Sequence, residues 1–216
     1  MLCSGGLDSV VLAADLATTT CVQPLYVASG LAWEPEERAT LVRALQAFPP
    51  GARTLPLHVI EASVRDVYPP THWSLTGTPP AYDTPDEDVY LVGRNVVLLG
   101  KAAVYCATRG IHRLCLGPLA DNPFPDATPE FFEAMSRALS LGLAHTIEIG
   151  TPYRTWHKPE VIRRGRQIGA PMELTMSCMQ PVDGAHCGAC SKCRERHDAF
   201  IDAIGEDPTT YREERR

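Results

Sequence analysis

The first chemically distinctive string in the chain lies at its start and reads Ser4, Gly5, Gly6, Leu7, Asp8, Ser9. Two glycines let the backbone turn tightly and expose consecutive N–H groups, and an apolar helical stretch follows whose positive N-terminal end attracts anions. The string therefore predicts a phosphate-binding loop to which Ser4 and Ser9 add hydroxyl donors. Asp8 is a poor phosphate ligand and is better suited to orienting the loop or helping to hold Mg²⁺. An ordinary glycine turn, with Asp8 or Ser9 capping the helix, is the alternative.

The second chemical signal is a cluster of thiols near the C-terminus, at Cys178, Cys187, Cys190 and Cys193. Four thiolates complete a tetrahedral zinc site, and the two short spacers let one tight knuckle supply three of them. No ligand position is left open, so the predicted Zn²⁺ is structural. An iron–sulfur cluster and a ligand role for the adjacent His186 are alternatives.

The elements that must position these motifs follow from the hydrophobic pattern. Strands are predicted at 21–28, 54–59, 113–116 and 146–149, and helices at 10–19, 34–48, 95–109, 129–141 and 158–168. Alternating strands and helices predict an α/β fold with a mainly parallel sheet and helices on both faces. The sheet pattern stops near Thr175. Residues 69–92, rich in Pro, Thr, Gly and Asp, are predicted to form a long loop of the kind that serves as a lid.

Composition narrows the function. The chain has 216 residues, enough for one α/β domain with a small appendage, and a formal net charge of −6. General nucleic-acid binders are usually basic, so nucleic acid is an unlikely partner. There is no apolar run of about 20 residues and no secretion signal, so no membrane association and a cytoplasmic location are expected. Lysine occurs only at Lys101, Lys158 and Lys192, which draws attention to each of them because arginine cannot always replace it.

The loop Ser4–Ser9 resembles the pyrophosphatase loop of the N-type ATP pyrophosphatases, which split ATP between the α- and β-phosphates and adenylate a substrate. Nearly the whole chain resembles the family of 7-cyano-7-deazaguanine synthases. The matching positions, in order, are Gly93-Arg94-Asn95, Asp126, Pro129-Glu130-Phe131, Ile147-Glu148-Ile149, Lys158, Glu160, Glu173-Leu174-Thr175, Ser177-Cys178, Cys187-Gly188, Cys190, Cys193-Arg194, Phe200 and Asp207-Pro208-Thr209.

The chain departs from the family pattern in three places. Only Met1-Leu2-Cys3 precede the loop, so the first strand is very short or the start codon is misassigned. Val92 stands where the family usually has proline. Residues 117–128 are shorter than usual, and Ala127-Thr128 replace Cys-Arg close to where the family holds its deazaguanine base.

The resemblance implies a Rossmann-like, adenine nucleotide alpha hydrolase-like fold. It divides the chain into an ATP pyrophosphatase domain (1–174) and a zinc-binding segment (175–216) packed on it as one structural unit. It implies an ATP-dependent carbon–nitrogen ligase that needs Mg²⁺ and Zn²⁺, releases AMP and pyrophosphate, and forms a homodimer. The substrate would be 7-carboxy-7-deazaguanine, converted with ammonia through the amide to the nitrile.

The resemblance also assigns roles to individual residues. The loop residues named above and Gly117 would bind the nucleotide. Lys158 would neutralise charge at the α-phosphate, Arg94 would bind phosphate or substrate, and Asp8 would assist magnesium. The residues expected to read the deazaguanine base are Asp121, Asn122 and Asp126.

Three alternatives remain open from the sequence. A relative in an antiphage system would pass the activated deazaguanine acyl group to a protein amine instead of ammonia. A tRNA-modifying enzyme, such as a tRNA thiolase or lysidine synthetase, would use the same loop, but the acidic charge argues against it. A zinc-binding interaction module without activity is disfavoured by the intact loop.

Overall fold

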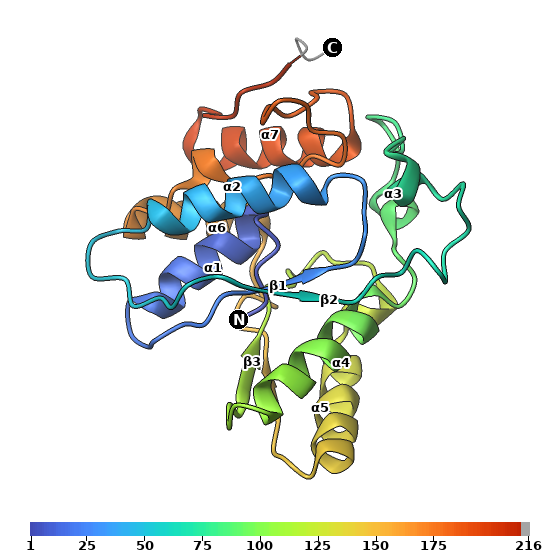
Figure 1. Ribbon diagram of the computed structural model, residues 1–216. Coiled ribbons are helices and arrows are strands. Elements are labelled where there is room, and N and C mark those ends of the chain that lie inside the picture. Colours follow the sequence, from blue (N-terminus) through green and yellow to red (C-terminus); the bar gives the residue numbers. More distant parts are fainter. Residues whose placement is uncertain (213–216) are drawn as a thin grey trace.

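The computed structural model describes residues 1–212, and parallel β-strands lie between its helices (Figure 1). Strand β1 (Leu25–Ala28) pairs with β2 (His58–Glu61), and β3 (Arg113–Cys115) pairs with β4 (Glu148–Gly150). Both pairings are parallel. The predicted α/β class with parallel strands is confirmed.

The N-terminal residues join the two strand pairs. Leu2 donates its backbone N–H to the carbonyl of Cys115 at 2.8 Å, and Cys3 donates to the carbonyl of Leu25 at 2.9 Å. Residues 1–3 therefore lie between β1 and β3, as the expected very short first strand. The order becomes β2, β1, residues 1–3, β3, β4, and the chain's direction of travel across the sheet reverses beside residues 1–3. Open α/β sheets bind ligands at such a switch point.

Residues 1–212 contain seven α-helices: α1 (Leu7–Ala17), α2 (Glu34–Gln46), α3 (Trp73–Thr76), α4 (Arg94–Ala107), α5 (Pro129–Leu143), α6 (Lys158–Ile168) and α7 (Ser191–Ile204). Three short 3₁₀ turns lie at Asp86–Val89, Pro125–Ala127 and Met172–Leu174. Helices α4 and α5 lie on one side of the strands, and α1, α2, α6 and α7 on the other (Figure 1). None of the helices in the described part of the chain is both long and apolar enough to span a bilayer.

Alternate side chains of β1 build the core on both faces. Val27 packs with Leu99 of α4 and Phe132 of α5. Tyr26 points to the opposite face and packs in a cluster with Leu41 of α2. This alternation is the two-residue period of a strand, so a strand with both faces buried reads as a continuous apolar run.

Two of the predicted strands are displaced because of proline. The strand expected at 21–28 begins at Leu25, directly after Pro24, and the one expected at 54–59 is replaced by His58–Glu61, beyond Pro56. Proline has no N–H to donate to a ladder, so pairing before these positions is reduced to the isolated bridge between Val22 and Thr54. The strand expected at 146–149 lies at 148–150.

Helix α7, which carries the last part of the cysteine cluster, was not predicted from the sequence. Its buried positions include Cys193, Arg196 and Phe200, which recur at helical spacing. This helical period was not recognised in the sequence, because arginine rarely occupies a core position and the cysteines were assigned to metal binding. Phe200 packs against Leu7 of α1 and Val161 of α6, so α7 shares a core with the first helix of the chain.

Candidate functional site

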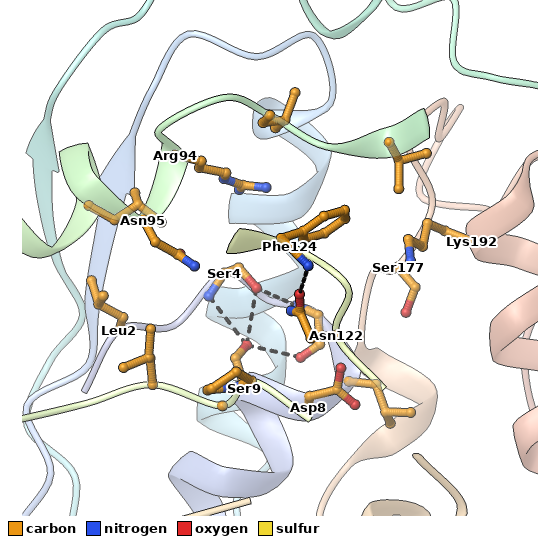
Figure 2. A pocket seen from close by; sticks show the side chains of 18 of the residues that line it. Leu2, Ser4, Asp8, Ser9, Arg94, Asn95, Asn122, Phe124, Ser177 and Lys192 are labelled. Atoms are coloured by element: carbon orange, nitrogen blue, oxygen red, sulfur yellow. Dashed lines mark hydrogen bonds between the residues drawn. The ribbon is translucent and has the colours of Figure 1, made fainter. Parts of the chain in front are cut away.

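A cavity of about 430 Å³ lies at the carboxyl ends of residues 1–3, β1 and β3. It is lined by the predicted phosphate loop, the start of α4, the segment after β3, the first residue of α6 and parts of the C-terminal segment. Figure 2 shows Arg94 and Lys192 approaching it from opposite sides, above Ser4, Ser9 and Asp8. The predicted non-metal site residues that line it are Ser4, Gly6, Leu7, Asp8, Ser9, Arg94, Gly117, Asp121, Asn122, Asp126 and Lys158.

The two serines of the loop hold its shape. Ser9 accepts the backbone N–H of Ser4 at 3.2 Å and donates its hydroxyl to the carbonyl of Gly6 at 3.0 Å, while Gly6 donates its N–H to the Ser4 hydroxyl at 3.2 Å (Figure 2). Helix α1 begins directly afterwards, with Gly6 at the N-cap and no side chain capping it. Neither Asp8 nor Ser9 caps the helix, so the capping role that the alternative gave them is not observed, and the phosphate-binding role of the loop stays a prediction. The positive end of α1 faces the cavity.

Gly5 turns the loop instead of lining the cavity. Its φ of +87° lies in the left-handed region, and a Cβ there would come within 2.8 Å of the Glu37 carbonyl oxygen. The Gly5 carbonyl accepts the backbone N–H of Met176 at 2.8 Å. Gly5 thus lets the loop pack closely between α2 and the C-terminal segment.

Four charged side chains form a chain of contacts on one wall of the cavity. Lys158 Nζ lies 3.5 Å from Asp8 Oδ2 and makes a short ion pair with Glu195 Oε1. The other oxygen of Glu195, Oε2, lies 2.7 Å from Lys192 Nζ. These groups come from the N-terminal parts of α1, α6 and α7, which the fold brings to one point.

Burial and neighbouring charges set the protonation states of these charged side chains. Burial raises the pKa of Asp8, although Lys158 opposes that shift. Burial also lowers the pKa of Lys158, but Asp8 and Glu195 outweigh it and hold that pKa above its ordinary value. For Glu195, burial raises the pKa, yet Lys158 and Lys192 dominate and lower it to about 2. Lys158 is therefore a cation at neutral pH beside the predicted phosphate loop.

Asp8 offers an oxygen that fits a magnesium ion. Its Oδ1 is buried and has no hydrogen-bond partner among the described residues. Carboxylate oxygen is a ligand that Mg²⁺ prefers, and Mg²⁺ sites in nucleotide enzymes usually use one or two carboxylates together with substrate phosphates. The donor set therefore suits a magnesium–nucleotide complex.

Arg94 is the first residue of α4 and points into the cavity (Figure 2). The N-cap is Gly93 in the left-handed conformation, and it offers no side chain to close the helix. Asp126 closes it from the segment after β3, because its Oδ2 accepts the backbone N–H of Asn95 at 2.9 Å. Arg94 Nε is buried and lacks a hydrogen-bond partner within the described part of the chain, as expected of a group that binds an anionic ligand.

The three residues predicted to read a base lie together, and each already has a protein partner. Asp121 Oδ2 lies 2.5 Å from Nδ1 of His157, and Asn122 Oδ1 accepts the N–H of Phe124 at 3.0 Å. Asp126 uses Oδ2 for the cap of α4. The predicted base-reading role of these residues stays a prediction.

The sequence did not single out several residues that line the cavity. Trp33 and Trp73 stack at 5.7 Å between ring centroids, and Tyr90 and Phe124 stack at 5.1 Å. Trp73 and Tyr90 lie in the segment 69–92 that was predicted to form a lid. The composition of that segment indicated a functional loop but did not indicate which aromatic side chains line the cavity. Glu195 was missed because it lies among the cysteines, which the sequence assigns to metal.

The four clustered cysteines bring their sulfur atoms within 4.8 Å of one another. Cys190 and Cys193 lie 3.5 Å apart, and Cys187 and Cys193 lie 3.9 Å apart. A tetrahedron with metal–sulfur bonds of about 2.3 Å has edges of about 3.8 Å, so these sulfurs fit a tetrahedral ion such as Zn²⁺. His186 is outside the cluster, and its Nε2 accepts the N–H of Ser177 at 3.1 Å. The four thiols alone could hold the metal.

A buried arginine ties the cysteine segment to the rest of the protein. Arg196 is 1% exposed and donates to the hydroxyls of Thr175 and Thr209 at 2.7 Å each and to the carbonyl of Met172 at 2.9 Å. The guanidinium fork therefore links α7 to the chain on both sides of the cysteine cluster. Arg196 was not predicted as a buried residue, because arginine is almost never fully buried unless it is paired.

Comparison with known proteins identifies the family of the chain. The family model described as queuosine biosynthesis protein QueC matches residues 1–204. The 7-cyano-7-deazaguanine synthase of Methanopyrus kandleri is 34% identical, with 99% of this chain and 98% of the relative covered. The synthases of Methanoculleus marisnigri and Methanothrix thermoacetophila are 35% and 34% identical, each with 97% of this chain and 96% of the relative covered. The chain therefore belongs to the QueC family of queuosine biosynthesis proteins.

Proposed function

We propose that this protein is an ATP-dependent carbon–nitrogen ligase that converts 7-carboxy-7-deazaguanine to 7-cyano-7-deazaguanine and releases AMP and pyrophosphate. The observation that carries the proposal is the position of Lys158 in a cavity of about 430 Å³. It lies there beside the predicted phosphate loop and the N-terminus of α1, which no side chain caps. A cavity of this size is in the usual range for small-molecule sites. The name of the curated relatives supports the choice of product.

The chemistry proceeds in two activations. A substrate carboxylate oxygen attacks the α-phosphorus of ATP, and pyrophosphate leaves. Ammonia then adds to the acyl carbon, and AMP departs to give the amide. The amide oxygen attacks a second ATP with loss of pyrophosphate, and elimination of AMP and the remaining N–H protons forms the nitrile. Adenylation is needed because the oxygen of a free carboxylate is a poor leaving group.

The protein's part is to bind the phosphates and stabilise the charge that develops on them. The N–H groups at the start of α1 would bind pyrophosphate, and Lys158 would neutralise charge at the α-phosphate. Arg94, with its unpartnered Nε, would bind phosphate or the substrate carboxylate. Asp8 would hold Mg²⁺ through its unpartnered Oδ1, and the ion would supply further positive charge to the phosphates.

The aromatic end of the cavity would take the deazaguanine base. The stacked pairs Trp33–Trp73 and Tyr90–Phe124 offer flat apolar faces to a fused ring. Asp121, Asn122 and Asp126 line the same cavity and would pair with the N–H groups of the base. Pairing with Asp126 would discriminate most, because Asp126 is buried and a buried polar group left unpaired is costly.

The remaining assignments complete the proposal. The fold is the adenine nucleotide alpha hydrolase-like form of the Rossmann arrangement, divided after residue 174. The C-terminal cysteines hold a structural Zn²⁺. The protein works in the cytoplasm as a homodimer. Ammonia is the proposed acceptor, in keeping with the synthase relatives.

The test is incubation with ATP and 7-carboxy-7-deazaguanine, with and without ammonia, followed by mass spectrometry. Formation of the nitrile and AMP only with ammonia supports the proposal. An acyl-adenylate that is stable to ammonia but transferred to a protein amine would favour the conjugating alternative. Absence of any adenylate with this substrate would overturn the proposal.

A further inference from the structure

Two carboxylates share one ammonium group on the wall of the cavity. Lys158 Nζ is 3.5 Å from Asp8 Oδ2 and in direct contact with Glu195 Oε1. The side chains of Lys158, Asp8 and Glu195 are 16%, 26% and 27% exposed, so protein screens them from much of the solvent. The lysine therefore lies closer to Glu195, which comes from α7, than to Asp8, which follows the phosphate loop.

Glu195 is itself held in place by a second lysine. Its Oε2 accepts from Lys192 Nζ at 2.7 Å, three residues earlier on the same helix. Both oxygens of Glu195 are thus engaged by cations. Asp8, in contrast, has only the longer 3.5 Å contact of its Oδ2 with Lys158 Nζ among the ion pairs of residues 1–212. Its Oδ1 is buried and has no hydrogen-bond partner in those residues.

This arrangement decides what Asp8 is able to bind. Without the negative charge of Glu195, Lys158 would have Asp8 as its neighbouring carboxylate. Attraction between unit charges grows as their separation falls, and strongly so where solvent is partly excluded. The ammonium would then move onto Asp8 and compete with a divalent cation for the same carboxylate.

We infer that Glu195 is a positioning residue that draws Lys158 away from Asp8 and so keeps Asp8 available to the Mg²⁺ of a magnesium–ATP complex. The inference rests on the proposed function, because it presumes that the cavity binds magnesium–ATP. It gives the cysteine-bearing segment a part in the nucleotide site, since Glu195 follows Cys193 by two residues. It also accounts for an acidic side chain in a cavity that otherwise needs cations for phosphate.

The experiment is calorimetric titration of the full chain with ATP over a series of Mg²⁺ concentrations, without the deazaguanine substrate. We expect Glu195→Gln to raise the Mg²⁺ concentration for half-maximal ATP affinity roughly tenfold, the size of effect that one pKa unit represents. Asp198→Asn is the matched control, because it removes the same charge from an exposed position on the same helix. It should leave the Mg²⁺ dependence unchanged.

A purely structural role for Glu195 would lower the folded fraction but leave the Mg²⁺ dependence of the folded protein as it is. An unchanged Mg²⁺ dependence in Glu195→Gln would therefore overturn the inference. If that variant fails to fold, Glu195→Asp decides: it keeps the charge on a shorter side chain and should raise the Mg²⁺ requirement to a lesser degree, whereas an unchanged requirement overturns the inference.

A double-mutant cycle tests whether Glu195 acts through Lys158. In a Lys158→Met background, Glu195→Gln should cause no further rise in the Mg²⁺ requirement, and an equal rise in both backgrounds would overturn the inference. Failure of the unmodified protein to bind ATP at any Mg²⁺ concentration would overturn the proposed function and this inference together. ATP binding by the unmodified protein with no shift in the variants would overturn this inference alone.

Discussion

Asp126 and Asn95 hold each other through two hydrogen bonds: the Asp126 carboxylate accepts the Asn95 backbone N–H at 2.9 Å, and the Asn95 side-chain amide donates to the Asp126 carbonyl at 2.8 Å. The pair closes the start of α4, which its own N-cap, Gly93, leaves open. Since Arg94 is the first residue of that helix, a residue 32 positions away, Asp126, fixes where Arg94 points.

Removal of this cap should affect stability and the site together. We expect Asp126→Ala to lower the free energy of unfolding by about 1–2 kcal/mol, as loss of a helix cap and its buried partner does. Urea denaturation measures this. Asn95→Ala should cost a similar amount, and the double variant less than the sum. If Asp126→Ala keeps its stability but no longer binds 7-carboxy-7-deazaguanine, its carboxylate contacts the base and does not serve the helix.

ATP should be cleaved to AMP and pyrophosphate, because the loop lacks the lysine of a Walker motif. Lys158→Ala should lower turnover by at least about 100-fold, as loss of one charge-stabilising group typically does. Lys101→Ala is the matched control, since Lys101 is exposed on α4, and it should retain full activity. Chromatography of the nucleotide products gives the answer, and ADP as the product would contradict the assignment of the loop.

The purified protein should contain about one Zn²⁺ per chain, as four thiolates within tetrahedral reach imply. Cys190→Ser should lose the metal and expose α7 to proteolysis. Cys21→Ser, at an exposed cysteine outside the cluster, should keep both metal and resistance. Metal analysis by mass spectrometry provides the count. Iron accompanied by a visible charge-transfer band would favour the iron–sulfur alternative.

Arg196 should be needed to keep the C-terminal segment in place. Arg196→Met retains much of the apolar volume but removes the hydrogen bonds that Thr175, Thr209 and Met172 accept from the guanidinium. We expect a loss of about 3 kcal/mol in the free energy of unfolding. Arg163→Met, at a position 53% exposed on α6, should lose little. Equal stability of the two variants would show that the Arg196 hydrogen bonds contribute no net stability.

Glu37 should make the stability of the protein depend on pH near neutrality. It is 7% exposed, accepts the Tyr26 hydroxyl at 2.7 Å, and burial raises its pKa from 4.5 to about 7. A raised pKa in the folded state favours the protonated carboxyl, so its stabilising contribution is complete below pH 4.5 and is lost as the pH rises through 7. The loss amounts to the order of 3 kcal/mol.

Urea denaturation at pH 5 and pH 8 measures this dependence. Glu37→Gln keeps an acceptor for Tyr26 but cannot ionise, so it should lose less stability between the two pH values than the unmodified protein does. Glu36→Gln, a more exposed neighbour on α2, should behave like the unmodified protein. The same pH slope in all three proteins would show that Glu37 does not ionise over this range.

The sequence by itself determined the local chemistry. A glycine loop before an apolar helix and four closely spaced cysteines depend on contacts within a few residues, so spacing alone predicted them. Alternation of apolar runs and amphipathic stretches likewise predicted the α/β class, since the hydrophobic pattern of each segment reflects how that segment is buried. The predicted strand boundaries were wrong near Pro24 and Pro56. Whether a residue pairs in a sheet depends on the donor or acceptor that faces it from another strand, and proline has no N–H to donate.

Only the tertiary structure decided which distant side chains meet. The N-terminal parts of α1, α6 and α7 converge, and this places Glu195 between Lys158 and Lys192 although it lies 37 residues beyond Lys158. No local pattern records such a meeting, because the charge of a side chain is the same whether it faces water or a cavity. Arg196 was hidden for the same reason: its burial is stable only because acceptors from separate segments surround it.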